Sequence, residues 1–242
     1  MPPAESRTPR IGFVPWRAAV VITGAGSVAV CALAVLFAAI LDNVVDGDGV
    51  TVWDRPVSSW LAAHREPGVT SVMRALTDAG NPPVLAAVMA AIAIGTAART
   101  RTLWPIALGA AAYGGFLLMV VTVKLAVGRP RPPQPEHVVA IDGSSFPSGH
   151  AAGIAVVALV SAWMVALESE WPRWISVTAW AAAVPLVAAV GFSRVYLGVH
   201  YPSDIVAGWA LGGAWGGVLI VAGTTVTPLW RGSPLGRRRC RP

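Results

Sequence analysis

Charged residues are scarce in this sequence. Asp, Glu, Lys and Arg together make up 12% of its 242 residues, about half of their share in a typical soluble domain. Hydrophobic residues make up 55%, and a single soluble core could not hide so much apolar surface. The scarcity of charge therefore excludes an ordinary soluble domain and indicates a membrane protein.

Acidic residues are rarer still, with 12 against 18 basic residues and a formal net charge of +6. In a soluble chain this excess of positive charge would indicate nucleic-acid binding. Here the basic residues mostly flank apolar segments, where the orientation of membrane helices accounts for them. We therefore expect the lipid bilayer as a partner, and we expect no nucleic acid.

Cysteine is nearly absent. Cys31 lies within the first apolar run, and Cys240 lies close to the C-terminus. Neither has neighbours typical of a metal site, and we expect no disulfide between them. Cys240, beside a basic tail, is either a free thiol or a lipidation site.

Six apolar stretches are long enough to cross a bilayer, which takes about 20 residues. They cover residues 18–41, 82–98, 103–124, 149–167, 174–191 and 204–223. The first is too long for the apolar region of a signal peptide, about 7–15 residues, so we expect it to stay in place. The sequence predicts an all-α polytopic membrane protein: a six-transmembrane-helix bundle over 17–223, between disordered cytoplasmic tails at 1–16 and 224–242.

Basic residues also predict the orientation of the bundle. With a cytoplasmic N-terminus, 11 of the 18 Lys and Arg residues fall inside, as the positive-inside rule requires. We therefore expect a multi-pass protein of a bacterial plasma membrane with both termini in the cytoplasm. The loops 42–81, 125–148 and 192–203 then lie outside.

The first outer loop is long and mixes apolar and polar residues at helical spacing over 56–64 and 69–78. We expect two amphipathic helices there, with apolar side chains at the lipid interface. The residues expected at the interface are Trp53, Trp60, Leu61, Val72, Met73 and Leu76. The segment is either a simple interfacial anchor or a lid for a lipid substrate.

The sixth apolar stretch is rich in glycine. Its glycines are Gly208, Gly212, Gly213, Gly216 and Gly217. Several of them are four residues apart, a spacing that lets membrane helices approach closely. We expect this stretch to pack tightly against neighbouring helices.

Three polar clusters interrupt the apolar pattern, and the topology places all of them outside. They are KLAVGRPRPP (124–133), FPSGHAAG (146–153) and GFSRVYLGVHYPSD (191–204). Each has a structural explanation: Lys124 can extend to the membrane surface, Ser148 can cap a helix, and Asp204 suits a helix N-terminus. One cluster alone would indicate no more than this.

Together the clusters supply the groups that a phosphate site needs. His150 and His200 are two of only four histidines, and both stand at expected outer helix starts. Lys124, Arg131 and Arg194 share that face, where ionisable groups cost free energy unless they pair or serve a function. Three cations and helix N-terminal amides favour an anion such as phosphate.

A metal centre is not expected at these clusters. Calcium or magnesium would need several oxygen ligands, and the nearby carboxylates Glu136, Asp142 and Asp204 have no regular spacing. Zinc bound by the two histidines would face the neighbouring cations. We therefore predict no metal and no cofactor.

The spacing across the three clusters resembles that of the type 2 phosphatidic acid phosphatase family of integral membrane lipid phosphatases. Lys-x6-Arg-Pro stands at 124–132, Pro-Ser-Gly-His at 147–150, and Ser-Arg-x5-His-x3-Asp at 193–204. The match is close over 124–204, and the six spans extend it over most of the chain. Arg129 belongs to a second Arg-Pro pair, but the spacing favours Arg131 as the phosphate ligand.

The resemblance implies a metal-independent phosphatase or diphosphatase with a phosphohistidine intermediate. It implies His200 as the nucleophile, Asp204 as the partner of the other ring nitrogen, and His150 as general acid and base. The implied phosphate ligands are Lys124, Arg131, Ser148, Gly149 and Arg194.

Further candidates lie close to these motifs. Ser193 either contacts the phosphate or, as we favour, orients Arg194. Arg129 is a reserve ligand, and Tyr201 and Tyr196 are candidates for lining the pocket. The two remaining histidines, His64 and His137, fall in no motif.

A site at the outer ends of spanning helices suits a phosphate carried on a lipid tail. Candidate substrates implied by the family are polyprenyl diphosphates, phosphatidic acid and phosphatidylglycerol phosphate, and the oligomeric state stays open. The alternative function is a membrane protein that binds or transports the lipid phosphate or another anion without hydrolysis. That alternative needs the cations but not the histidines. Vanadate-dependent haloperoxidases share the motifs but are soluble, and the six spans argue against them.

Overall fold

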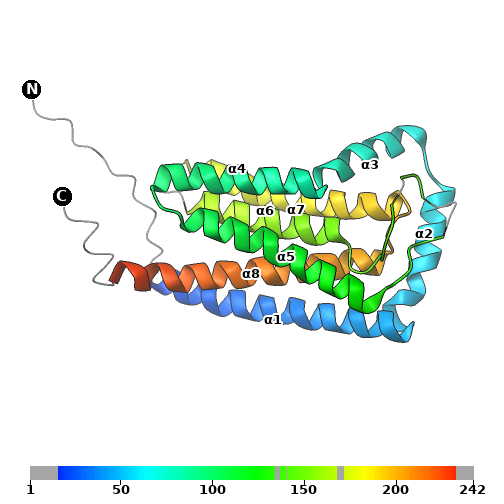
Figure 1. The fold of residues 1–242 in the computed structure, drawn as a ribbon, viewed down its shortest axis with the longest axis horizontal. Coiled ribbons are helices and arrows are strands. Elements are labelled where there is room, and N and C mark those ends of the chain that lie inside the picture. The colour runs from blue at the N-terminus through cyan, green and yellow to red at the C-terminus, as the bar shows by residue number, and fades with distance from the viewer. Residues whose placement is uncertain (1–15, 134–136, 140, 168–171, 233–242) are drawn as a thin grey trace, which may run out of the picture.

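The computed structural model describes residues 16–133, 137–139, 141–167 and 172–232, and within these ranges it contains helices and no strands (Figure 1). The helices are α1 (Trp16–Asp46), the short 3-10 helix η1 (Gly49–Trp53), α2 (Asp54–Ala63), α3 (Pro67–Ala79), α4 (Pro82–Thr100), α5 (Trp104–Val127), α6 (Gly149–Ala166), α7 (Arg173–Tyr196) and α8 (Pro202–Gly232). Six of them are long and apolar enough to span a membrane. The predicted all-α bundle of six spans is therefore confirmed.

Several helix ends differ from the predicted spans. α7 continues past residue 191 to Tyr196, so Arg194 lies in its last turn rather than in an outer loop. The extension is possible because the guanidinium finds a partner in Thr77, which offsets the cost of burying a charge. α8 includes residues 224–232, which were predicted as tail. Residues 1–15 and 233–242 of the predicted tails, Glu136 and Cys240 lie outside the described residues.

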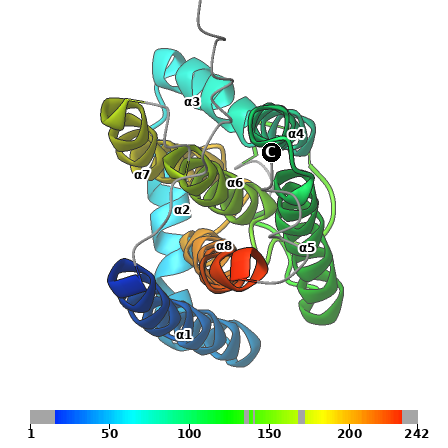
Figure 2. The same cartoon turned by 90° about the vertical axis from the view of Figure 1, so that its left-hand side faces the viewer.

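α6 is the central helix of the bundle (Figure 2). It packs against α4, α5, α7 and α8. In its apolar stretch 67% of the residues are buried, against 6% in the apolar stretch of α1 and 11% in that of α7. A helix that is apolar on every side is suited to this place, because neighbours cover it all round. Its core contacts include Val156 and Met164, with Phe116 of α5. The outer helices leave their apolar faces to the lipid.

The glycines of α8 allow close helix contacts, as predicted. A Cβ atom on Gly208 would lie 2.7 Å from the carbonyl oxygen of Ser148, just before α6, and one on Gly212 would collide with the carbonyl oxygen of Ala152 in α6. Gly217 faces α1 instead, where a Cβ would meet Val30. α8 therefore touches α6 along one side and α1 along another, and its first turn is held beside the first turn of α6.

Within the loop 42–81, residues Asp54–Ala63 form α2 and Pro67–Ala79 form α3, which confirms the two predicted helices. In Figure 1 they lie at the right-hand end of the bundle, with α2 running across that end. Trp53 and Trp60 are exposed, as expected for an interfacial segment. Leu61 and Met73 were also expected at the lipid interface, but they pack against the buried cluster that includes Tyr196. α2 and α3 (residues 54–79) therefore pack onto the end of the bundle, and we call these two helices the roof.

Candidate active site

The three polar clusters meet at the end of the bundle that α2 and α3 cover. α5 ends at Val127 and is capped by Gly128, whose φ of 62° is left-handed and suits glycine, and the chain then turns back across the helix ends. The Ser145 amide donates to the Arg129 carbonyl at 2.8 Å, and the Ser148 amide donates to the Asp204 carbonyl at 3.0 Å. These backbone bonds tie the first cluster to the second and the second to the third.

His200 lies in the turn between α7 and α8 and contacts Asp204 in the first turn of α8. Its Nδ1 is 3.3 Å from the Asp204 Oδ2, and the two side chains are 2% and 0% exposed. Because Nδ1 faces a carboxylate, it carries the proton, and Nε2 keeps its lone pair. That lone pair faces the Arg131 Nη1 at 3.2 Å. The contact expected from the four-residue spacing is therefore present.

Burial, with smaller contributions from the charges of Arg194 and Arg131, outweighs the opposing effect of Asp204 and lowers the pKa of His200 to about 4. Removing the ring from water disfavours its charged form. The imidazole is therefore neutral at neutral pH, which is the form that a nitrogen nucleophile requires.

Three cations from different elements lie near one another beside Asp204 and the two histidines. Lys124, in the last turn of α5, donates to the carbonyl oxygens of Ser144 and Ser145. Arg131 donates from Nη1 to the Val199 carbonyl at 2.7 Å. The positive charges of Lys124, Arg131 and Arg194 act on one another and on His150. Such a convergence of cations is stable when an anion occupies the space between them.

Arg194 is the most deeply buried of the three cations. It is 3% exposed, and its Nη1 donates to the Thr77 hydroxyl at 2.7 Å. Its Nε has no hydrogen-bond partner within the described part of the chain. A buried donor without a partner is costly, and a phosphate oxygen would satisfy it.

The start of α6 adds helix N-terminal amides to the cluster. Ser148 is the N-cap, and its hydroxyl accepts from the Ala151 amide at 3.4 Å, so the predicted cap is confirmed. Gly149 is the first helical residue, and amides at this position have no acceptor within their own helix. The positive end of the helix dipole therefore lies at the cluster.

His150 is the second residue of α6, and its Nε2 lies 2.9 Å from the Asn81 Oδ1. The Asn81 Nδ2 donates to Asp78 at 3.1 Å, which fixes the amide so that its oxygen faces His150. The Nε2 nitrogen therefore carries a proton. The other ring nitrogen, Nδ1, is the one left for proton transfer.

Sequence reasoning missed three residues, from α2, α3 and the turn before α4, that contact residues of the three polar clusters. Asp54 of α2 pairs with Arg129 at 2.7 Å, Thr77 of α3 binds Arg194, and Asn81 precedes α4 and binds His150. None of them belongs to a motif. The one local signal was the Asn-Pro-Pro helix start at Asn81, and it indicates a helix start rather than a contact to a histidine.

Several candidates take other roles. Arg129 binds carboxylates and stacks over the Tyr201 ring, with 4.5 Å from its Cζ to the ring centroid. The Ser193 hydroxyl donates to the Val190 carbonyl at 2.6 Å, whereas the Arg194 guanidinium donates to the Thr77 hydroxyl of α3. The Tyr196 hydroxyl accepts from the Glu66 amide at 3.0 Å.

The two histidines outside the motifs also have local contacts. His64 is exposed and stacks on Trp60, with 4.5 Å between the ring centroids. The His137 Nε2 lies 2.6 Å from the Pro132 carbonyl oxygen. Neither contact involves a residue of the cation cluster.

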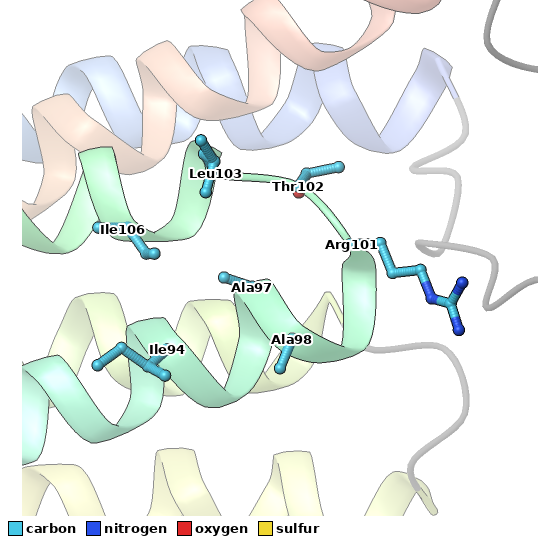
Figure 3. Close-up of a pocket in the computed structure, with 7 residues that line it drawn as sticks. All are labelled: Ile94, Ala97, Ala98, Arg101, Thr102, Leu103 and Ile106. Atoms are coloured by element: carbon cyan, nitrogen blue, oxygen red, sulfur yellow. The ribbon is translucent and has the colours of Figure 1, made fainter.

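An apolar pocket lies at the other end of the bundle, at the turn between α4 and α5 (Figure 3). Its lining includes Ile94, Leu103 and Ile106, and the Arg101 side chain points away from them. The histidines and the three cations lie at the opposite ends of α4 and α5, so this pocket plays no part in the candidate site.

The sequence of this chain matches a known protein family. The family model of the PAP2 superfamily matches residues 102–227. This chain belongs to the PAP2 superfamily. The match includes all three motifs, and this PAP2 protein is accordingly a multi-pass membrane phosphatase that acts on lipid phosphates.

Similar proteins carry related activities in their names. Decaprenylphosphoryl-5-phosphoribose phosphatase of Mycobacterium tuberculosis is 33% identical over 159 residues, which cover 63% of this chain and 80% of that protein. Phosphatidylglycerophosphatase B of Bacillus subtilis is 29% identical over 177 residues, covering 73% and 86%. Undecaprenyl-diphosphatase of Sulfolobus acidocaldarius is 41% identical over 68 residues, 28% of each chain.

A solved structure shares the fold. The crystal structure of a transmembrane PAP2-type phosphatidylglycerolphosphate phosphatase from Bacillus subtilis superposes with a TM-score of 0.73. The superposition covers 82% of this chain and 96% of that one at 24% identity. The likeness shows a common membrane fold.

Proposed function

We propose that this PAP2 protein hydrolyses a lipid phosphate through a phosphohistidine on His200. The observation that carries the proposal is the orientation of the His200 ring. Nδ1 faces Asp204, and Nε2 faces Arg131, so the lone pair points to where a bound phosphate would be held. Asp204 also stabilises the positive charge that the ring gains when it is phosphorylated.

The reaction takes two displacements. In the first, the His200 Nε2 forms a bond to phosphorus, the bond from phosphorus to the leaving oxygen breaks, and His150, in its doubly protonated form, gives the Nδ1 proton to that oxygen. In the second, the Nδ1 of the now neutral His150 takes a proton from water, the water oxygen binds phosphorus, and the bond from phosphorus to the His200 Nε2 breaks. Lys124, Arg131 and Arg194 offset the phosphoryl charge in both steps.

The surroundings of the site favour a lipid over a soluble phosphate ester. Leu125 follows Lys124 on α5 and is 81% exposed, and Phe192 near the end of α7 is 46% exposed. Both lie at the site end of spanning helices, where an apolar tail can stay in the bilayer while its phosphate reaches the cations. We favour a polyprenyl diphosphate, phosphatidic acid or phosphatidylglycerol phosphate.

The orientation of the bundle is part of the proposal. The excess of basic residues on the predicted inner side supports cytoplasmic termini in a bacterial plasma membrane and an active site on the extracytoplasmic face. An outward-facing site suits the recycling of a polyprenyl diphosphate carrier. Tags at both termini should be inaccessible to an external protease in intact cells, and cleavage of the C-terminal tag would contradict this orientation.

Phosphate release from a lipid phosphate in the presence of EDTA tests the reaction. We expect activity to persist with the chelator, to disappear in His200→Ala, and to remain in His64→Ala. His64 is a suitable control because it is an exposed histidine of the roof. A requirement for added divalent metal, or activity in His200→Ala, would contradict the mechanism. Binding of the lipid without phosphate release by the wild type would favour the binding or transport alternative.

A further inference from the structure

Arg129 bridges two carboxylates that belong to distant parts of the chain. Its Nη2 lies 2.7 Å from the Asp54 Oδ2 in the roof, and its Nη1 lies 2.6 Å from the Asp204 Oδ1 in α8. The side chain of Arg129 is 13% exposed, that of Asp54 is 3% exposed and that of Asp204 is 0% exposed. Buried charges require partners of this kind. One guanidinium therefore joins the roof to the residue that contacts His200.

Asp54 also holds the start of α8. Its Oδ1 accepts from the Ser203 amide at 3.0 Å, and its Oδ2 accepts from the Ser203 hydroxyl. The first amides of a helix have no acceptor within the helix, and a carboxylate at that end is favourable. Asp54, from α2, thus caps the start of α8 through Ser203, the residue immediately before Asp204.

The two oxygens of Asp204 have separate partners. Oδ1 is bound by Arg129, whereas Oδ2 faces the His200 Nδ1 and accepts from the Tyr201 amide at 2.9 Å. Rotation of the carboxylate would break the bond to Arg129 as well as the contact with His200. Arg129 therefore fixes which oxygen faces the imidazole and at what angle.

We propose that Asp54 and Arg129 are positioning residues for the nucleophile, acting through Asp204 to hold the His200 ring. The inference rests on the proposed role of His200 as the nucleophile. It gives the roof a part in catalysis beyond anchoring. Arg129 binds carboxylates, so the pair governs the rate of phosphoryl transfer and not the affinity for phosphate.

The test uses the full-length protein with a lipid phosphate in detergent micelles. The variants are Asp54→Asn, Arg129→Lys and their combination. The matched control is Asp42→Asn, because Asp42 is an exposed carboxylate near the C-terminal end of α1. Asp54→Asn keeps an acceptor for the Ser203 amide but removes the charge. Arg129→Lys keeps the charge but cannot bridge both carboxylates.

We expect kcat to fall about 10²-fold in Asp54→Asn and Arg129→Lys, as small misplacements of a reacting group do. KM and product inhibition by inorganic phosphate should change by less than about threefold, because the phosphate cations stay in place. The combined variant should lose little more than either single variant, since both act on one contact. Asp42→Asn should match the wild type.

The rate of phosphoenzyme formation, followed by rapid acid quench, separates the outcomes. If the wild type forms no phosphohistidine, the proposed function fails and the inference fails with it. If the wild type forms it and the two variants form it at the same rate, the inference alone is overturned. Loss of phosphate inhibition together with kcat would show a merely structural role and would also overturn it.

Discussion

Asn81 and His150 form a hydrogen bond between the starts of α4 and α6, with 2.9 Å between the Asn81 Oδ1 and the His150 Nε2. Asn81 precedes α4, and His150 lies in the first turn of α6. Asp78 holds the amide nitrogen of Asn81. The pair fixes the orientation of the imidazole and assigns the proton to Nε2. The turn between α3 and α4 therefore orients the residue that we propose as the acid and base.

Replacement of Asn81 by alanine should lower kcat by about 10- to 100-fold, because His150 loses the bond that orients it. KM should change little, since Asn81 does not reach the phosphate cations. Steady-state kinetics on a lipid phosphate measure both constants. Asn43→Ala, the same change in the last turn of α1, is the control. An unchanged kcat in Asn81→Ala would show that packing alone orients His150.

Replacement of His150 by alanine should have unequal effects on two kinds of substrate. For an alkyl lipid phosphate, loss of the general acid should cost about 10²–10⁴-fold in rate. For an aryl phosphate, whose leaving group needs little protonation, the first displacement should continue, whereas the second lacks its base. Phosphohistidine should therefore accumulate, and acid-quench analysis detects it. Equal losses on both substrates, with no accumulation, would contradict the assigned role.

The spans and the motif residues were predictable because their signals are local. Twenty apolar residues predict a span in any context, and a four-residue spacing at the start of a helix places Asp204 beside His200. The Ser148 cap likewise depends on its immediate neighbours. These parts of the site are properties of single helices and turns.

The roof contacts were not predictable because they depend on tertiary packing. Asp54 is separated from Ser203 by 149 positions, and Thr77 from Arg194 by 117. No local pattern distinguishes Asp54 from the exposed Asp48 a few residues earlier. The spacing rule favoured Arg131 over Arg129 for phosphate, but it could not indicate that Arg129 has two carboxylate partners.

The ring of His200 should titrate well below its ordinary pKa of 6.5, at about 4. Burial is the main cause, so the charged form is disfavoured and the neutral nucleophile persists as the pH falls to that value. An unfolded chain would bind the proton near 6.5. The free energy of unfolding should therefore decline as the pH falls from about 6.5 to about 4. The NMR titration of the His200 Cε1 resonance, assigned with His200→Gln, measures the midpoint. A midpoint at or above 6.5 would contradict the buried, neutral ring.

Gly212→Ala should destabilise the bundle, whereas Gly114→Ala should not. A Cβ on Gly212 would collide with the Ala152 carbonyl oxygen, and backbone cannot move aside cheaply; a Cβ on Gly114 meets nothing within 4 Å. Overpacking of this kind costs about 1–3 kcal/mol, while alanine in place of an exposed helical glycine is favourable by up to about 1 kcal/mol. Thermal unfolding in detergent compares the two variants. Because α6 carries Ser148 and His150, Gly212→Ala should also lose activity below its unfolding midpoint. Equal midpoints for both variants would mean that α6 and α8 are not in close contact.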